Sequence, residues 1–106
     1  MFTRNVTIHL KPNCLTEFKG TIENQVIPLL RRQNGFQDEI TLVAPEGLTA
    51  IGISFWDRKE NAEAYSRTTY PEVLKALANV VEGTPQVQTY EVSNSTVQKS
   101  AARAAA

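Results

Sequence analysis

The sequence predicts an α+β domain whose elements follow the order β-α-β-β-α-β. Apolar residues alternate with a two-residue period over four short segments, as strands with one buried face do. They recur every three or four positions over two longer segments, as helices packed on a sheet do. This order is the split βαβ, or ferredoxin-like, motif, in which a four-stranded antiparallel sheet has the spatial order 4-1-3-2 and both helices lie on one face.

The first helix has three boundary signals. Asn13 offers an N-cap. Pro28 lies late in the helix and should kink or break its last turns, because proline lacks a backbone donor. Asn34-Gly35 should end the helix, since glycine takes the left-handed conformation at little cost. The expected elements are, in order, a strand over 2–11, a helix over 13–33, strands over 38–44 and 50–56, a helix in two pieces over 57–82 that Gly83 terminates, and a strand over 86–93.

The third strand runs into the second helix without a linker. Asp57 is expected to be the N-cap of that helix, with Glu60 as its capping-box partner. A second capping box, formed by Thr69 and Glu72, should restart the helix after a bend near Thr68. We therefore interpret these carboxylates as structural and not as a catalytic pair.

Composition limits the classes of function. With 106 residues, the chain should form one domain over 1–93, followed by a Ser/Ala-rich tail over 94–106 that offers no large side chain to bury. Eleven basic residues balance eleven acidic ones, which argues against a nucleic-acid partner. No apolar run approaches a membrane span or a signal peptide, and a single cysteine, Cys14, excludes an internal disulfide. We expect a soluble, cytoplasmic protein without membrane or nucleic-acid partners.

The first and third strands should be neighbours, and their residues suggest a pocket. Small and polar groups on a buried face leave volume and supply hydrogen-bonding atoms, as in many small-molecule sites. Trp56 would lie at the edge of this pocket, and Tyr65 and Tyr70 would close one end. The face expected to be solid holds Val6, Ile8 and Leu10 with Ile51, Ile53 and Phe55; the pocket face holds Thr3, Asn5, Thr7 and His9 with Ala50, Gly52, Ser54 and Trp56.

His9, the only histidine, is the candidate general base of that pocket. The alternative interpretation, a structural residue bonded to a neighbouring strand or to a second subunit, is the more common role of such a histidine. Two interpretations are also open for Trp56, Tyr65 and Tyr70, which could pack in the core or form the wall of the pocket. The sequence holds no glycine-rich phosphate loop, metal-ligand spacing or nucleophile elbow. Because helices cover only one face of the sheet, self-association through the other face is predicted.

Three stretches of the chain resemble a known family. Residues 6–12 (VTIHLKP), 26–36 (VIPLLRRQNGF) and 54–65 (SFWDRKENAEAY) are similar to those of the antibiotic biosynthesis monooxygenase-like group of the dimeric α+β barrel superfamily. The resemblance covers residues 2–93. It implies a homodimer whose two sheets face each other as a barrel, with a cleft between helices and sheet in each subunit. Members include cofactor-independent oxygenases of aromatic polyketides, haem-degrading oxygenases and many proteins of unknown activity.

The haem-degrading members have an asparagine on strand one, a tryptophan in the helix after strand three and a histidine one helix later. Asn5 matches the first, which favours the polar face as the cleft, but Tyr65 and Lys75 stand where the other two would be. Lysine cannot serve as a neutral proximal ligand, so no cofactor is expected. Two hypotheses follow from the resemblance. One is a cofactor-independent monooxygenase of an aromatic or polyketide-like substrate, with His9 or a tyrosine handling protons; the alternative is a non-catalytic homodimer that binds a small apolar ligand or is structural.

Overall fold

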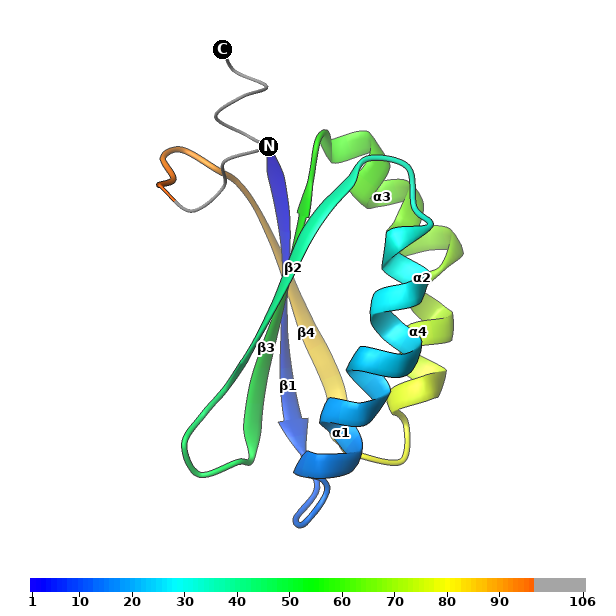
Figure 1. Ribbon diagram of the computed structural model, residues 1–106, viewed down its shortest axis with the longest axis vertical. Helices are drawn as coiled ribbons and strands as arrows, with labels where there is room; N and C mark the ends of the chain where they lie inside the picture. The colour runs from blue at the N-terminus through cyan, green and yellow to red at the C-terminus, as the bar shows by residue number, and fades with distance from the viewer. Residues whose placement is uncertain (97–106) are drawn as a thin grey trace.

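A computed structural model describes residues 1–96 of the chain. Its four strands form one antiparallel sheet in the order β2-β3-β1-β4, and all the helices lie on one face of it (Figure 1). The predicted α+β, ferredoxin-like fold is therefore confirmed. The predicted tail over 94–106 falls mostly outside the described residues. The elements are β1 (Phe2–Leu10), α1 (Leu15–Thr21), η1 (Ile22–Val26), α2 (Ile27–Arg31), β2 (Phe36–Val43), β3 (Thr49–Trp56), α3 (Lys59–Thr68), α4 (Tyr70–Leu77) and β4 (Val81–Glu91).

The first helix accommodates its proline through a wider turn. Residues Ile22–Val26 form a π-helical turn between α1 and α2, in which the N–H of Ile27 donates to the carbonyl of Ile22 five residues earlier. Pro28 follows in the first turn of α2. A proline ring crowds the carbonyl four residues before it, and a widened turn relieves that contact. The distortion thus precedes the proline, whereas the sequence placed it in the last turns.

Both predicted capping boxes are wrong. The N-cap of α3 is Arg58, and neither it nor Thr69 at the start of α4 makes a side-chain cap bond. Asp57 Oδ1 instead accepts a hydrogen bond from Asn61 Nδ2 at 2.8 Å. Thr69 Oγ1 donates to Gln33 Oε1 at 3.3 Å, which ties α4 to the residues after α2. Thr69 thus connects two distant segments, and neither Asp57 nor Thr69 caps its own helix.

Two residues with positive φ mark the ends of the first helix. Asn13 (φ 62°) lies in the preceding turn and Cys14 is the N-cap, so the predicted cap at Asn13 is one residue early. Gly35 (φ 79°) follows the helix as predicted, and its carbonyl accepts a hydrogen bond from the N–H of Asp57 at 2.9 Å. Gly35 thereby joins the end of the first helix to the junction of β3 and α3.

The last strand begins earlier than the sequence indicates. α4 ends at Leu77, so Val80 and Val81, predicted as helical, form the turn and the first residue of β4. Val81 pairs with Leu10 and is buried. Gly83 (φ 70°), predicted to end the helix, lies inside β4 where the register with β1 shifts. Glycine at a strand irregularity is common because it adopts that backbone without strain.

The register of β1 and β3 corrects the predicted faces. Arg4 pairs with Ser54, Val6 with Gly52 and Ile8 with Ala50, so the apolar side of β1 shares its face with the small residues of β3. The predicted grouping of Val6 and Ile8 with the isoleucines of β3 is wrong by one residue. A one-residue slip moves every side chain to the other face of a sheet. The face under the helices is therefore the one with both the apolar residues of β1 and the space left by β3.

The outer face of the sheet is not covered by the residues described. It carries Asn5 and His9 from β1 together with Ile53 and Phe55 from β3. Leu42, on the edge strand β2, is 50% exposed on this face. Self-association through this face remains a prediction. Within residues 1–96, no helix is long and apolar enough to cross a membrane.

Candidate functional site

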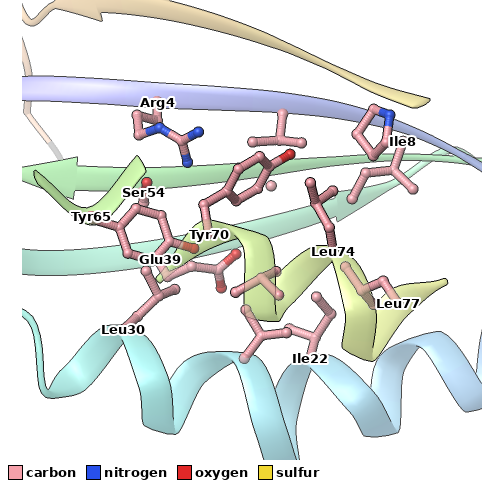
Figure 2. A pocket seen from close by; sticks show the side chains of 15 residues that line it. Arg4, Ile8, Ile22, Leu30, Glu39, Ser54, Tyr65, Tyr70, Leu74 and Leu77 are labelled. Atoms are coloured by element: carbon pink, nitrogen blue, oxygen red, sulfur yellow. The ribbon is translucent and has the colours of Figure 1, made fainter. Parts of the chain in front are cut away.

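A cavity lies between the sheet and the helices. Its walls are mostly apolar, with side chains from β1, β3, η1 and α4. Its volume of about 50 Å³ has room for a few water molecules. Figure 2 shows the polar groups that line it, which gather from three strands and two helices: Arg4, Glu39, Ser54, Tyr65 and Tyr70.

Arg4 is the most unusual of these residues. Its side chain is only 3% exposed, and its guanidinium carbon lies 4.4 Å from the ring centre of Tyr70 and 5.1 Å from that of Tyr65. Within residues 1–96 it makes no ion pair, and its one polar side-chain contact is with the Tyr70 hydroxyl, at a geometry too poor for a regular hydrogen bond. Burial lowers the pKa of Arg4, and the two tyrosines oppose that shift. The cavity thus contains a cation held by aromatic faces and by no carboxylate.

The two tyrosines differ in their contacts. Tyr65 is 3% exposed, and burial raises its pKa to about 12, an effect that the charge of Arg4 opposes. Burial also raises the pKa of Tyr70, again against the influence of Arg4. The Tyr70 hydroxyl is buried and has no hydrogen-bond partner of good geometry among the described residues, although the Arg4 guanidinium is close enough to oppose the rise in its pKa as a donor. Both phenols are therefore protonated at neutral pH and available as donors.

Trp56 lies behind this site and does not line it. Its side chain is 0% exposed, its ring centre is 5.1 Å from that of Tyr65, and Phe36 meets it edge-on at 5.7 Å. The indole Nε1 donates to Ser54 Oγ at 2.9 Å. Trp56 thereby fixes the positions of Tyr65 and Ser54, which line the cavity.

Glu39 connects the cavity to the surface. It lines both the inner cavity and a more open groove of about 620 Å³ between β2 and the first helix, as does Ile22. Burial raises the pKa of Glu39, and the hydrogen bond that Thr41 Oγ1 donates to it at 2.7 Å opposes the shift. The register places Glu39, Ser54 and Arg4 in one row across β2, β3 and β1. A carboxyl and a guanidinium therefore lie on either side of a serine.

The structure separates the residues that the sequence grouped. Tyr65 and Tyr70 line the cavity, whereas Asn5 and His9 lie on the opposite face of the sheet. The prediction that the face with Asn5 and His9 forms the cleft is therefore wrong. His9 is exposed near the end of β1, and Asn5 Oδ1 is buried without a hydrogen-bond partner among the described residues. Their functional roles remain predictions.

Sequence reasoning did not select Arg4 or Glu39 as site residues. Arg4 stands at the same alternate positions of the strand as Phe2, Val6 and Ile8, so its side chain had to point to the same side as these apolar residues. A charged residue at such a position was the signal that could have identified it. Glu39 had no comparable signal, because its orientation depends on the irregular register between Phe36 and Asp38. Within residues 1–96, no group of three or more His, Cys, Asp or Glu side chains is placed to hold a metal ion.

Comparisons with known proteins identify the fold. No protein-family model matches the chain, and no curated protein matches it by sequence. Solved structures match well despite low sequence identity. A Bordetella bronchiseptica protein provisionally named an antibiotic biosynthesis monooxygenase has a TM-score of 0.74 at 17% identity, covering 86% of this chain and 95% of its own.

Two further structures have more specific descriptions. A monooxygenase from the gene ActVA-Orf6 of Streptomyces coelicolor, in complex with nanaomycin D, has a TM-score of 0.76 at 15% identity, covering 91% of this chain and 90% of its own. SnoaB, a cofactor-independent oxygenase from Streptomyces nogalater, has a TM-score of 0.74 at 14% identity, covering 91% and 96%. The structural neighbours are thus antibiotic biosynthesis monooxygenase proteins, and the resemblance in the sequence is confirmed at the level of the fold.

Proposed function

We propose that this protein binds a small aromatic molecule between its helices and sheet and oxidises it as a cofactor-independent oxygenase. The observation that carries the proposal is a mostly apolar cavity with two tyrosines, which shares an ionisable carboxyl, Glu39, with an open groove. Two proteins of this fold support the chemistry, since one is a cofactor-independent oxygenase and another binds nanaomycin D. A cytoplasmic location remains a prediction from the sequence.

The reaction needs no external reductant if the substrate supplies the electrons. An acidic ring CH₂ group loses a proton to a base, and the resulting carbanion donates electrons to O₂. The net change converts CH₂ and O₂ into C=O and H₂O, so one oxygen atom enters the product and the other leaves with both hydrogens. Glu39 is the proton acceptor in this proposal, because its raised pKa makes its carboxylate a stronger base than a solvated one.

The groove supplies the volume that the inner cavity lacks. Drug-sized ligands occupy roughly 300–1,000 Å³, far more than the 50 Å³ of the cavity but comparable to the 620 Å³ of the groove. Glu39 and Ile22 line both spaces. A substrate therefore enters along β2 and displaces these two side chains to reach Tyr65 and Tyr70.

The proposed active form is a homodimer through the outer face of the sheet. Leu42 is half exposed there, and Ile53 and Phe55 are partly exposed beside it. Asn5 Oδ1 lies on the same face, buried and without a partner among the described residues. A second copy would cover the apolar side chains and bring a donor to this oxygen.

The alternative is a non-catalytic protein that binds a small ligand in the same cavity, which the cavity's small volume favours. Oxygen consumption with a panel of hydroxylated aromatic substrates separates the two. We expect turnover by the wild type, a loss of roughly 100-fold or more in Glu39→Gln, and none in the exposed matched control Glu72→Gln. Saturable binding without turnover for any substrate supports the alternative. Loss of turnover in His9→Ala with retention in Glu39→Gln assigns the proton to His9.

A further inference from the structure

We propose that Arg4 and Tyr70 form a binding site for one negatively charged oxygen of the ligand. The inference rests on the cavity being the ligand site, as in the proposed function, and adds the charge and the orientation of the ligand. It applies whether the protein is an oxygenase or a binding protein. The site would accept a phenolate, an enolate or a carboxylate carried on an apolar body.

The first argument is the unbalanced charge of Arg4. A buried ion is costly unless an opposite charge or hydrogen bonds compensate it. Arg4 is 3% exposed, and within the part of the chain described it has no opposite charge and only a poorly aligned contact with the Tyr70 hydroxyl. The faces of Tyr65 and Tyr70 offset part of this cost through cation–π contacts. A guanidinium has five N–H donors, and apart from the contact with Tyr70 no acceptor for them is found in residues 1–96.

The second argument is the excess of donors around Arg4. The buried Tyr70 hydroxyl also lacks a partner among residues 1–96. The polar groups in the same row of the sheet bond elsewhere, since Ser54 Oγ accepts from Trp56 and Glu39 Oε2 accepts from Thr41. An anionic oxygen would accept from both Arg4 and Tyr70, which makes short, charge-assisted bonds. A neutral ligand would leave the guanidinium unpaired.

Glu39 limits the ligand to a single charge at one end. The backbone of Glu39 lies two strands from that of Arg4 in the same row, roughly 10 Å away by strand spacing. A second negative group reaching Glu39 would meet a carboxylate. The rest of the cavity wall is mostly apolar, with Ile8 and Leu74 among its residues (Figure 2). The geometry therefore favours an apolar or aromatic monoanion with its charged oxygen at Arg4.

The single tryptophan of the chain makes the test direct. Trp56 contacts Tyr65, so its fluorescence reports on the cavity wall. Benzoate and the neutral benzyl alcohol are the probe pair. We expect benzoate to bind the wild type roughly 10- to 100-fold more tightly, the range for hydrogen bonds to a charged group. 4-Nitrophenol is the phenol arm, because the yellow colour of its anion shows whether the bound form is charged.

Three variants decide the roles of the two donors. Arg4→Met should remove the preference for benzoate, Tyr70→Phe should reduce it severalfold, and Arg67→Met, an exposed arginine on α3, should retain it. Arg4→Lys keeps the charge and replaces Arg4→Met if that variant does not fold, which far-ultraviolet circular dichroism will show. It should retain part of the preference.

Equal affinity of the wild type for benzoate and benzyl alcohol would overturn the proposal. The absence of benzoate binding at millimolar concentration would also overturn it, as would an unchanged preference for benzoate in folded Arg4→Met. If only Arg4→Lys folds, a preference for benzoate in Tyr70→Phe equal to that of the wild type would overturn the proposal. The oxygenase proposal and the anion-site proposal can each fail without the other. Anion binding without any oxygen consumption contradicts the oxygenase and supports the site, whereas turnover of neutral substrates without anion preference does the reverse.

Discussion

Arg4 and Glu39 are ionisable side chains that the sheet carries into an otherwise apolar interior. Each is in its charged form at a cost, because burial lowers the pKa of Arg4 and raises that of Glu39. No ion pair between them, or with any other group in residues 1–96, offsets that cost. Residues retained in this way are typical of sites where function opposes stability.

Glu39→Gln should therefore stabilise the protein at neutral pH. The folded-state pKa of Glu39 lies above its unfolded value, so the contribution of the neutral carboxyl to stability is complete below the unfolded pKa and is lost as the pH rises through the folded pKa. Glutamine does not ionise, and it keeps an acceptor for Thr41. Urea denaturation should show a gain on the order of 1 kcal/mol or less at pH 7.

The same gain in stability should disappear near pH 3, where Glu39 is protonated in both the folded and the unfolded state of the wild type. Glu72→Gln, at an exposed carboxylate on α4, is the matched control and should change little at either pH. An equal gain at pH 3 and pH 7 would identify a packing effect and contradict the electrostatic explanation.

Tyr65 should make the protein sensitive to alkali. Its folded-state pKa of about 12 lies above the ordinary value of 10, so the protein loses stability as the pH rises from about 10 through 12. Tyr65→Phe removes the ionisable group and should flatten this part of the stability curve. Thermal unfolding followed by circular dichroism at pH 9 and pH 11 measures the difference. A loss at pH 11 as steep in Tyr65→Phe as in the wild type would contradict this assignment.

At the scale of elements, the junction of β3 and α3 is held by Gly35. Its positive φ disfavours any other residue, and a Cβ there would collide with Asp57 Oδ1 and Asn61 Nδ2. Gly35→Ala should lower the free energy of unfolding by at least about 1 kcal/mol, and by more where the loop cannot move. Urea denaturation measures the change.

Gly20→Ala is the matched control for this prediction. Gly20 lies within α1, and a Cβ there would meet nothing within 4 Å. Alanine in a helix interior is more favourable than glycine by roughly 0.5–1 kcal/mol, so this variant should be more stable than the wild type. Equal losses in both variants would show that the collision at Gly35 is relieved at little cost.

Elements were more predictable than the contacts between them. The order of strands and helices follows from local apolar periods, which is why the split βαβ arrangement and the break at Thr69 are visible in the sequence. Register depends on pairing between distant segments. The sequence therefore grouped Val6 with Ile53, although β1 and β3 pair one residue differently. This one-residue difference in register moved the candidate site to the other face of the sheet. The sequence therefore selected His9 and did not select Arg4.

At the scale of the whole molecule, the sheet divides the chain into a helix-covered face with the cavity and a face that no described residue covers (Figure 1). A 106-residue domain buries a modest fraction of its surface. The uncovered face has apolar residues on β2 and β3 and polar ones on β1 and β4. The site and the proposed dimer contact are thus on opposite sides of one sheet, and substitutions in one can be tested without touching the other.

Ile53→Glu should therefore convert the protein to a monomer while leaving the cavity intact. Ile53 lies on the central strand β3, opposite Asn5 on the uncovered face, and a carboxylate at the centre of an apolar contact would be buried without a partner. Light scattering after size exclusion should give twice the 11.8 kDa chain mass for the wild type and a single chain mass for the variant.

Arg67→Glu, on the exposed side of α3, is the control for the added charge and should remain a dimer. Leu42→Glu is a second variant for the case in which Ile53→Glu does not fold, since Leu42 is 50% exposed and its replacement should disturb the monomer little. Benzoate should still quench Trp56 in any folded monomeric variant, because the cavity is lined from the other face of the sheet. A monomeric wild type at tens of micromolar, or a dimer unaffected by both substitutions, would show that this face does not mediate self-association.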